Sequence, residues 1–151
     1  EERVEAVRNI LIADRMLVRT VKRMQPLHDN IVLFLTSDNE TIIREYNRIR
    51  RRILKVMREI HRASDSDYPL RHIRKLEKQR QQAEKMDALL SGRVNKLLLE
   101  GKISNVMATS LINDSEQASK VMQNLIDVAT LLYYPRDRLV EEMQEAETAA
   151  G

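Results

Sequence analysis

The sequence predicts an all-α protein, an up-and-down antiparallel bundle of about four long helices. Apolar residues recur every three or four positions along most of the 151-residue chain. Glycine and proline number only three each, too few for many short strands and turns. The segments between the periodic stretches are short, so consecutive helices must lie antiparallel. Aromatic residues are 3% of the chain, which predicts an aliphatic core.

The first helix is expected over residues 2–35. Pro26 interrupts it, and a kink is favoured over a break because the apolar pattern resumes in phase after the proline. One side of this helix is expected to face the core. That side is formed by Val4, Val7, Ile10, Leu11, Leu17, Val18, Val21, Met24, Leu27, Ile31, Phe34 and Leu35.

The second helix is expected over residues 40–62. Ser37 or Asp38 can cap its N-terminus, and Ser37 with Glu40 has the spacing of a capping box. A short loop follows. In it, Asp67 can cap the third helix, with Pro69 in the first turn.

The third helix is expected to end near residue 100, because Gly101 is well placed to adopt a left-handed conformation there. Ser104 can cap the fourth helix, which continues to residue 134, where Pro135 breaks it. Residues 1–134 are therefore expected to form the helical bundle domain. Residues 135–151 are expected to form a short amphipathic tail, partly frayed.

No catalytic or cofactor motif is present, so we expect no enzyme, no metal site and no cofactor. The chain has no cysteine, no Glu-x-x-His pair and no Gly-rich phosphate loop. Among the histidines, His28 falls on the apolar side of the first helix, and His61 and His72 are expected at the surface. The chain begins at Glu1 and has no apolar run near the ~20 residues of a membrane span, so we expect a part of a longer protein or a processed chain.

Positive charge concentrates in the middle of the chain, where residues 44–85 hold 14 basic and six acidic residues. Spacings of three and four place six of the cations on one helical face. This pattern favours a surface that meets lipid headgroups, nucleic acid or an acidic protein, and a solvated face paired with acids of a neighbouring helix explains it equally well. Tyr46 is the one aromatic residue nearby, which disfavours binding of single-stranded nucleic acid. The stripe consists of Arg44, Arg48, Arg51, Lys55, Arg58 and Arg62.

Polar residues interrupt the apolar side of two helices. Asn113 and Asp114 lie in the middle of the fourth helix, and Asp14 lies between Leu11 and Leu17 in the first. A buried carboxylate must be paired or hydrogen-bonded. A cationic side chain of a facing helix or a bound cation would satisfy these groups. A buried polar network that fixes helix register is the favoured interpretation.

The string "LLLEGKISNVMATSLINDSEQASKVMQNLIDVATLLY", residues 97–133, resembles the C-terminal cytoplasmic region of bacterial sodium/phosphate cotransporter family proteins. The resemblance rests on Gly101-Lys-Ile-Ser104, on Met107 through Ser115, and on Gln123-Asn-Leu-Ile126. The segment "SDNETIIREYNRIRRRILKVMREI" also looks like that region. The repeated acidic metal motif of the PhoU family is missing, so metal binding is not carried over.

The resemblance implies a PhoU-like helical domain beneath a transporter, at the cytoplasmic face of the inner membrane. Its function would be non-enzymatic regulation or assembly of a sodium-dependent phosphate transporter. The expected partners are the transmembrane part of the same protein, anionic lipid headgroups and a second copy in a homodimer. The alternatives are a basic helical adaptor for an acidic protein or, less favoured, for nucleic acid, and a PhoU-type regulator of phosphate uptake.

Overall fold

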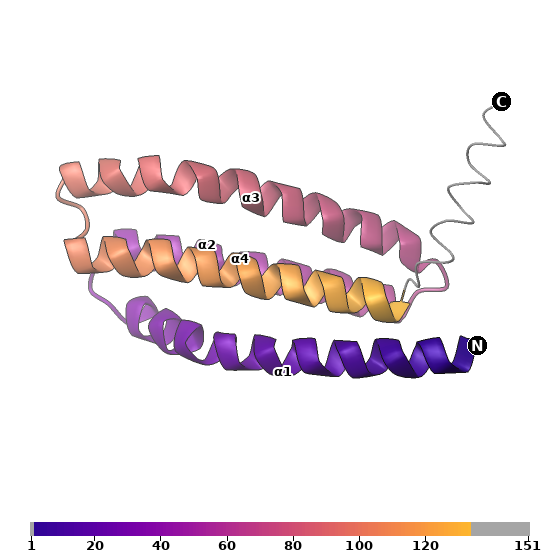
Figure 1. The fold of residues 1–151 in the computed structure, drawn as a ribbon. Coiled ribbons are helices and arrows are strands. Elements are labelled where there is room, and N and C mark those ends of the chain that lie inside the picture. The colour runs from indigo at the N-terminus through magenta and orange to yellow at the C-terminus, as the bar shows by residue number, and fades with distance from the viewer. Residues whose placement is uncertain (1, 134–151) are drawn as a thin grey trace, which may run out of the picture.

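Four long helices form an antiparallel bundle in the computed structural model, which describes residues 2–133, apart from the side chains of residues 2 and 86–89. The chain reverses direction at each connection (Figure 1). The predicted all-α, up-and-down architecture is confirmed, while the tail predicted over 135–151 lies outside the described residues. The helices are α1 (Glu2–Leu35), α2 (Glu40–Ser64), α3 (Pro69–Leu99) and α4 (Asn105–Tyr133).

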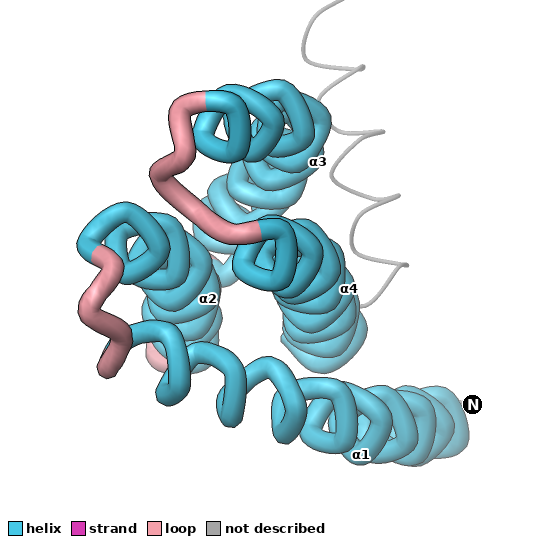
Figure 2. The backbone as a smooth tube through the Cα atoms, turned by 90° about the vertical axis from the view of Figure 1, so that its left-hand side faces the viewer, coloured by secondary structure: helices cyan, strands magenta, loops and turns pink. Residues whose placement is uncertain are grey.

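Helix α4 is the central element of the bundle because it makes the most extensive contacts with the other three helices. Helices α2 and α4 run in the same direction and also touch, and α1 contacts α4 far more extensively than α2. Figure 2 shows why: α1 crosses the other three obliquely, and its N-terminal end extends past α4. The small buried residues Ala108, Ser115 and Ala118 of α4 allow this close approach of its neighbours.

The core is aliphatic, as the composition predicts, with one aromatic pair in it. The rings of Phe34 and Tyr46 stack with their centroids 4.6 Å apart. Tyr46 is completely buried, as are Ile42, Leu76 and Val94. Burial of these side chains is the main source of stability, at about 1.5–3 kcal/mol for each large aliphatic group.

The cap of α2 differs from the prediction. Neither Ser37 nor Asp38 is the N-cap: Asn39 takes that position, and its Oδ1 accepts hydrogen bonds of 3.0 Å from the amides of Thr41 and Ile42. Asn39 directly precedes the first helical residue, which is where a capping side chain must lie. Its Nδ2 also donates to the carbonyl of Lys102, at 2.8 Å, and so joins two loops at one end of the bundle.

The other helix ends follow the sequence more closely. Asp67 does not cap α3, whose N-cap Tyr68 makes no side-chain capping bond, while Pro69 occupies the first turn as predicted. Gly101 has φ of 64°, the left-handed conformation expected of it. The Ser104 hydroxyl accepts a hydrogen bond of 3.2 Å from the amide of Met107, which confirms the predicted cap of α4.

Helix α1 continues through Pro26 and bends toward its C-terminal end (Figure 1). The prediction of which α1 residues face the core is only partly correct. Every seventh residue from Ala13 through Leu27 to Phe34 is buried, whereas most of the other predicted apolar positions are exposed. The pattern covers more than one face, and only one of these faces meets the bundle. The exposed residues are Val4, Val7, Ile10, Leu11, Leu17, Val18 and Val21.

Candidate anion-binding face

All six predicted stripe cations lie exposed on one face of α2. The opposite face of the helix carries Ile42, Ile49, Ile53 and Val56, which are buried. This strong separation of apolar and charged sides drives α2 to fold against the bundle with its cations outward. Helix α2 therefore presents a continuous basic face, the α2 basic face, made of Arg44, Arg48, Arg51, Lys55, Arg58 and Arg62.

Two of these cations are paired with carboxylates. Arg48 Nη1 lies 2.6 Å from Glu45 Oε1, and Arg62 Nη1 lies 3.2 Å from Glu59 Oε2. Both acids belong to α2 itself and not to a neighbouring helix, as the solvated-face interpretation had supposed. Among the described side chains, no carboxylate lies within 4.0 Å of the cationic groups of Arg51, Lys55 or Arg58.

Arg51, Lys55 and Arg58, which lack a carboxylate partner among the described residues, border a surface hollow of about 570 Å³, and Arg50 also lines it. Most of its wall comes from α2, and Gln79 is the residue that α3 contributes. No carboxylate of the described residues lies within 4.0 Å of Arg51, Lys55 or Arg58, so the hollow concentrates positive potential at one place on the surface. The wall residues are Arg50, Arg51, Leu54, Lys55, Arg58, Glu59, Arg62 and Gln79.

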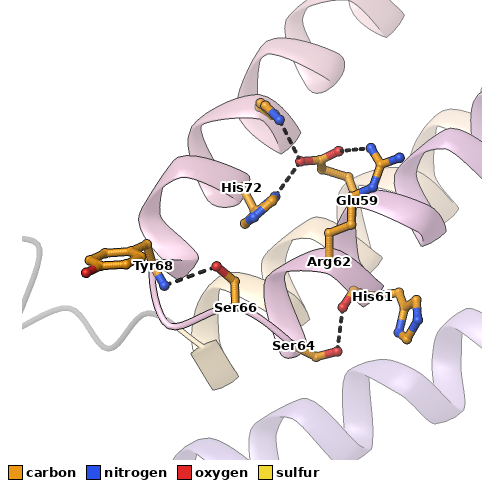
Figure 3. Close-up of polar contacts among 8 residues, drawn as sticks. Glu59, His61, Arg62, Ser64, Ser66, Tyr68 and His72 are labelled. Carbon is orange, nitrogen blue, oxygen red and sulfur yellow. Dashed lines mark hydrogen bonds and ion pairs between the residues drawn. The ribbon is translucent and has the colours of Figure 1, made fainter.

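Below this face, the buried carboxylate of Glu59 gathers donors from two helices (Figure 3). Its Oε1 lies 2.7 Å from His72 Nδ1 and 3.5 Å from Lys75 Nζ, both on α3, while its Oε2 pairs with Arg62. The prediction that His72 is a surface group is therefore wrong, because its side chain is only 16% exposed. His61 is at the surface, as expected.

Burial raises the pKa of Glu59, but the hydrogen bonds from His72 and Arg62 and the charge of Lys75 outweigh it and hold the pKa below its usual value. The ionised carboxylate then stabilises the fold above its unfolded-state pKa of about 4.3. That contribution is lost as the pH falls through the lower pKa of the folded state.

We therefore expect wild-type protein to lose more stability between about pH 6 and about pH 3 than a Glu59→Gln variant, which has no proton to take up at this position. Urea unfolding at the two pH values measures the difference. Glu116→Gln is the matched control, because Glu116 is exposed and pairs with Lys120 at 2.6 Å within α4. An equal pH dependence in wild-type protein and Glu59→Gln would contradict the stabilising role of this carboxylate.

A second buried carboxylate, Glu45, lies two heptads before Glu59 on α2. Its Oε2 accepts from Arg93 of α3 at 2.8 Å, and its Oε1 from Arg48. Neither acid was predicted from the sequence to be buried. The signal was available, because Glu45 lies four residues before the buried Ile49 and Glu59 lies three residues after the buried Val56, spacings that share one side of a helix.

The polar interruption of α4 is a buried network centred on Asp114. Its Oδ2 accepts from the Tyr46 hydroxyl at 2.6 Å, and the Asn30 amide donates to both carboxylate oxygens at 3.1 Å. Three helices, α1, α2 and α4, therefore meet at one carboxylate, which forms a buried polar network as predicted; that the network fixes helix register stays a prediction. Burial, followed by the bond to Asp114, raises the pKa of Tyr46, so the phenol stays protonated and donates.

The other predicted members of this polar site do not join it. Asn113 and Asp14 are exposed, because each lies one position beyond the buried side of its helix. His28 was expected on the apolar side of α1, but its side chain is 69% exposed and lies 3.4 Å from Asp29. The neighbouring Leu27 takes the core position instead.

Within the described part of the chain, no group of three or more histidine, cysteine, aspartate or glutamate side chains is arranged to hold a metal ion. None of the helices described has a stretch both long and apolar enough to span a bilayer. No protein-family model, curated protein or solved structure matches the chain.

Proposed function

We propose that this chain is a non-enzymatic regulatory or assembly domain of a sodium-dependent phosphate transporter. Residues 97–133 resemble the cytoplasmic region of that family, and this supports the assignment. The domain would lie at the cytoplasmic face of the inner membrane, with the transmembrane part of the same protein as its partner. The α2 basic face would be turned toward anionic phosphate groups.

One observation supports the α2 basic face as the surface that meets anionic groups. Arg51, Lys55 and Arg58 are exposed, lie on one face and border one hollow without a carboxylate partner in the described structure. A cation that is already paired with a carboxylate attracts an anionic ligand less strongly. Unpaired ones near an anionic bilayer attract it by about 1 kcal/mol each.

Reversing the three charges together, as Arg51→Glu, Lys55→Glu and Arg58→Glu, is expected to abolish binding to vesicles that contain anionic phospholipid. Circular dichroism should show unchanged helicity, because the side chains are exposed. Vesicle sedimentation measures the binding. The choice of residues leaves the Arg48–Glu45 and Arg62–Glu59 pairs intact.

The matched control reverses three exposed cations of α1, as Arg15→Glu, Arg19→Glu and Arg23→Glu. It changes the net charge by the same amount on a different helix and should retain vesicle binding. Equal loss in both variants would show that only net charge matters and would contradict a role of α2. Binding of duplex DNA with a steep salt dependence, in place of vesicles, would instead support the nucleic-acid adaptor.

A further inference from the structure

The hollow on the α2 basic face is lined by the neutral polar side chain of Gln79 as well as by cations. Its side chain lies between α3 and α2 and borders both the large hollow and a smaller one of about 120 Å³. Lys55 is shared by the two hollows in the same way. The smaller hollow continues to Val56 and Met122, so the pair of hollows runs from a charged rim to an apolar interior.

The charge of the large hollow is not cancelled by the acid in its wall. Both oxygens of Glu59 are occupied by His72, Lys75 and Arg62. Its negative charge is already balanced by Arg62 and Lys75, so it does little to neutralise Arg51, Lys55 and Arg58. The hollow therefore suits an anion with several oxygens that can accept from more than one cation.

Gln79 narrows the choice of anion. Its Oε1 is buried and accepts no hydrogen bond from any described group. A buried acceptor that receives no hydrogen bond destabilises the protein. A fully ionised oxyanion cannot relieve it, because it brings only acceptors. An anion that keeps one hydroxyl can donate a hydrogen bond to Gln79 Oε1.

We propose that the hollow binds a single phosphate group, as inorganic phosphate or as a phosphomonoester. Its charged oxygens accept from Arg51, Lys55 and Arg58, and its remaining hydroxyl donates to Gln79 Oε1. A phosphomonoester is partly protonated near neutral pH, since its second pKa is about 6, whereas sulfate has no such proton. The volume of about 570 Å³ leaves space for an organic substituent on the phosphate. This inference rests on the proposed function, for which it names the group recognised.

The experiment compares phosphate, which keeps a hydroxyl on phosphorus near neutral pH, with sulfate, which has none, and adds a phosphomonoester. Isothermal titration of the full 151-residue chain uses inorganic phosphate, glycerol 3-phosphate and sulfate. Phosphate is expected to bind with one-to-one stoichiometry and about tenfold more tightly than sulfate, as one hydrogen bond to a charged ligand allows. Gln79→Met removes the acceptor at similar size and should make phosphate and sulfate equal. Gln82→Met, at the neighbouring exposed glutamine, should leave the preference intact.

Vesicles distinguish a lipid source of the phosphate from a free one. Phosphatidate carries a phosphomonoester, and phosphatidylmethanol carries a phosphodiester whose headgroup has no hydroxyl. Stronger binding to phosphatidate, lost in Gln79→Met, would identify a lipid headgroup as the ligand. Saturable binding of inorganic phosphate without any preference between the two lipids would identify free phosphate.

Equal affinity of wild-type protein for phosphate and sulfate would overturn the proposed site, as would a preference that survives Gln79→Met. Vesicle binding that still depends on Arg51, Lys55 and Arg58 would then leave the proposed function standing. If the charge reversal leaves vesicle binding unchanged while the phosphate preference persists, the membrane role fails and the phosphate site remains.

Discussion

Replacing Tyr46 by alanine is expected to lower the free energy of unfolding by about 4 kcal/mol, the range found when a large core aromatic is truncated. The side chain is completely buried and stacks on Phe34. Its loss opens a cavity where α1, α2 and α4 meet and removes the donor that lies 2.6 Å from Asp114. Denaturant unfolding followed by circular dichroism measures the change.

Tyr46→Phe separates the two causes, because it keeps the ring and removes only the hydroxyl. It is expected to cost about 1.5–2 kcal/mol, as expected for the loss of a hydrogen bond to a charged group. The Asn30 amide still donates to the carboxylate in this variant. Equal losses for the phenylalanine and alanine variants would contradict the importance of ring packing.

Replacing Asp114 by alanine is the second large effect, expected at about 3 kcal/mol. The Tyr46 hydroxyl and the Asn30 amide would both lose their acceptor, the hydroxyl in a fully buried place. Asp114→Asn keeps the size of the side chain and one acceptor oxygen, so it should cost less. Unfolding by urea measures both variants.

A double-mutant cycle joins the two predictions. Tyr46→Phe and Asp114→Ala share one hydrogen bond, so the double variant should lose less stability than the two single losses added together. Exposed Asn113 offers the control: Asn113→Ala beside Asp114 should change stability by less than about 0.5 kcal/mol. Strict additivity of the cycle would show that Tyr46 and Asp114 do not act through one another.

Periodicity predicted the helices well because each helix must bury a side, but it could not decide which apolar residues find a neighbour. On α2 the apolar side is narrow, and Ile42, Ile49 and Ile53 are buried as the pattern requires. On α1 the apolar residues cover a wide arc, and only the arc that includes Ala13 and Leu27 meets the bundle. The obliquity of α1 is a property of helix packing that a linear pattern does not contain.

The candidate site, too, could be predicted only in part from the sequence. The exposed stripe could be read from the spacing of Arg51, Lys55 and Arg58, because exposure follows from distance to the apolar side of the same helix. The partners of Glu59 could not be predicted from the sequence. His72 lies on another helix, and its contact with Glu59 depends on how α2 and α3 pack against each other. The position of Gln79 at the hollow likewise depends on the packing of α3 against α2.

The oblique course of α1 has a consequence for how the protein opens. From residue 3 to residue 12, no side chain of α1 is buried, and the N-terminal end extends past α4 (Figure 2). These first turns can unwind without disturbing the interior, so their amides should exchange with deuterium by local fraying long before those around Leu27. A protease should remove this end first, and the shortened chain should melt at nearly the same temperature.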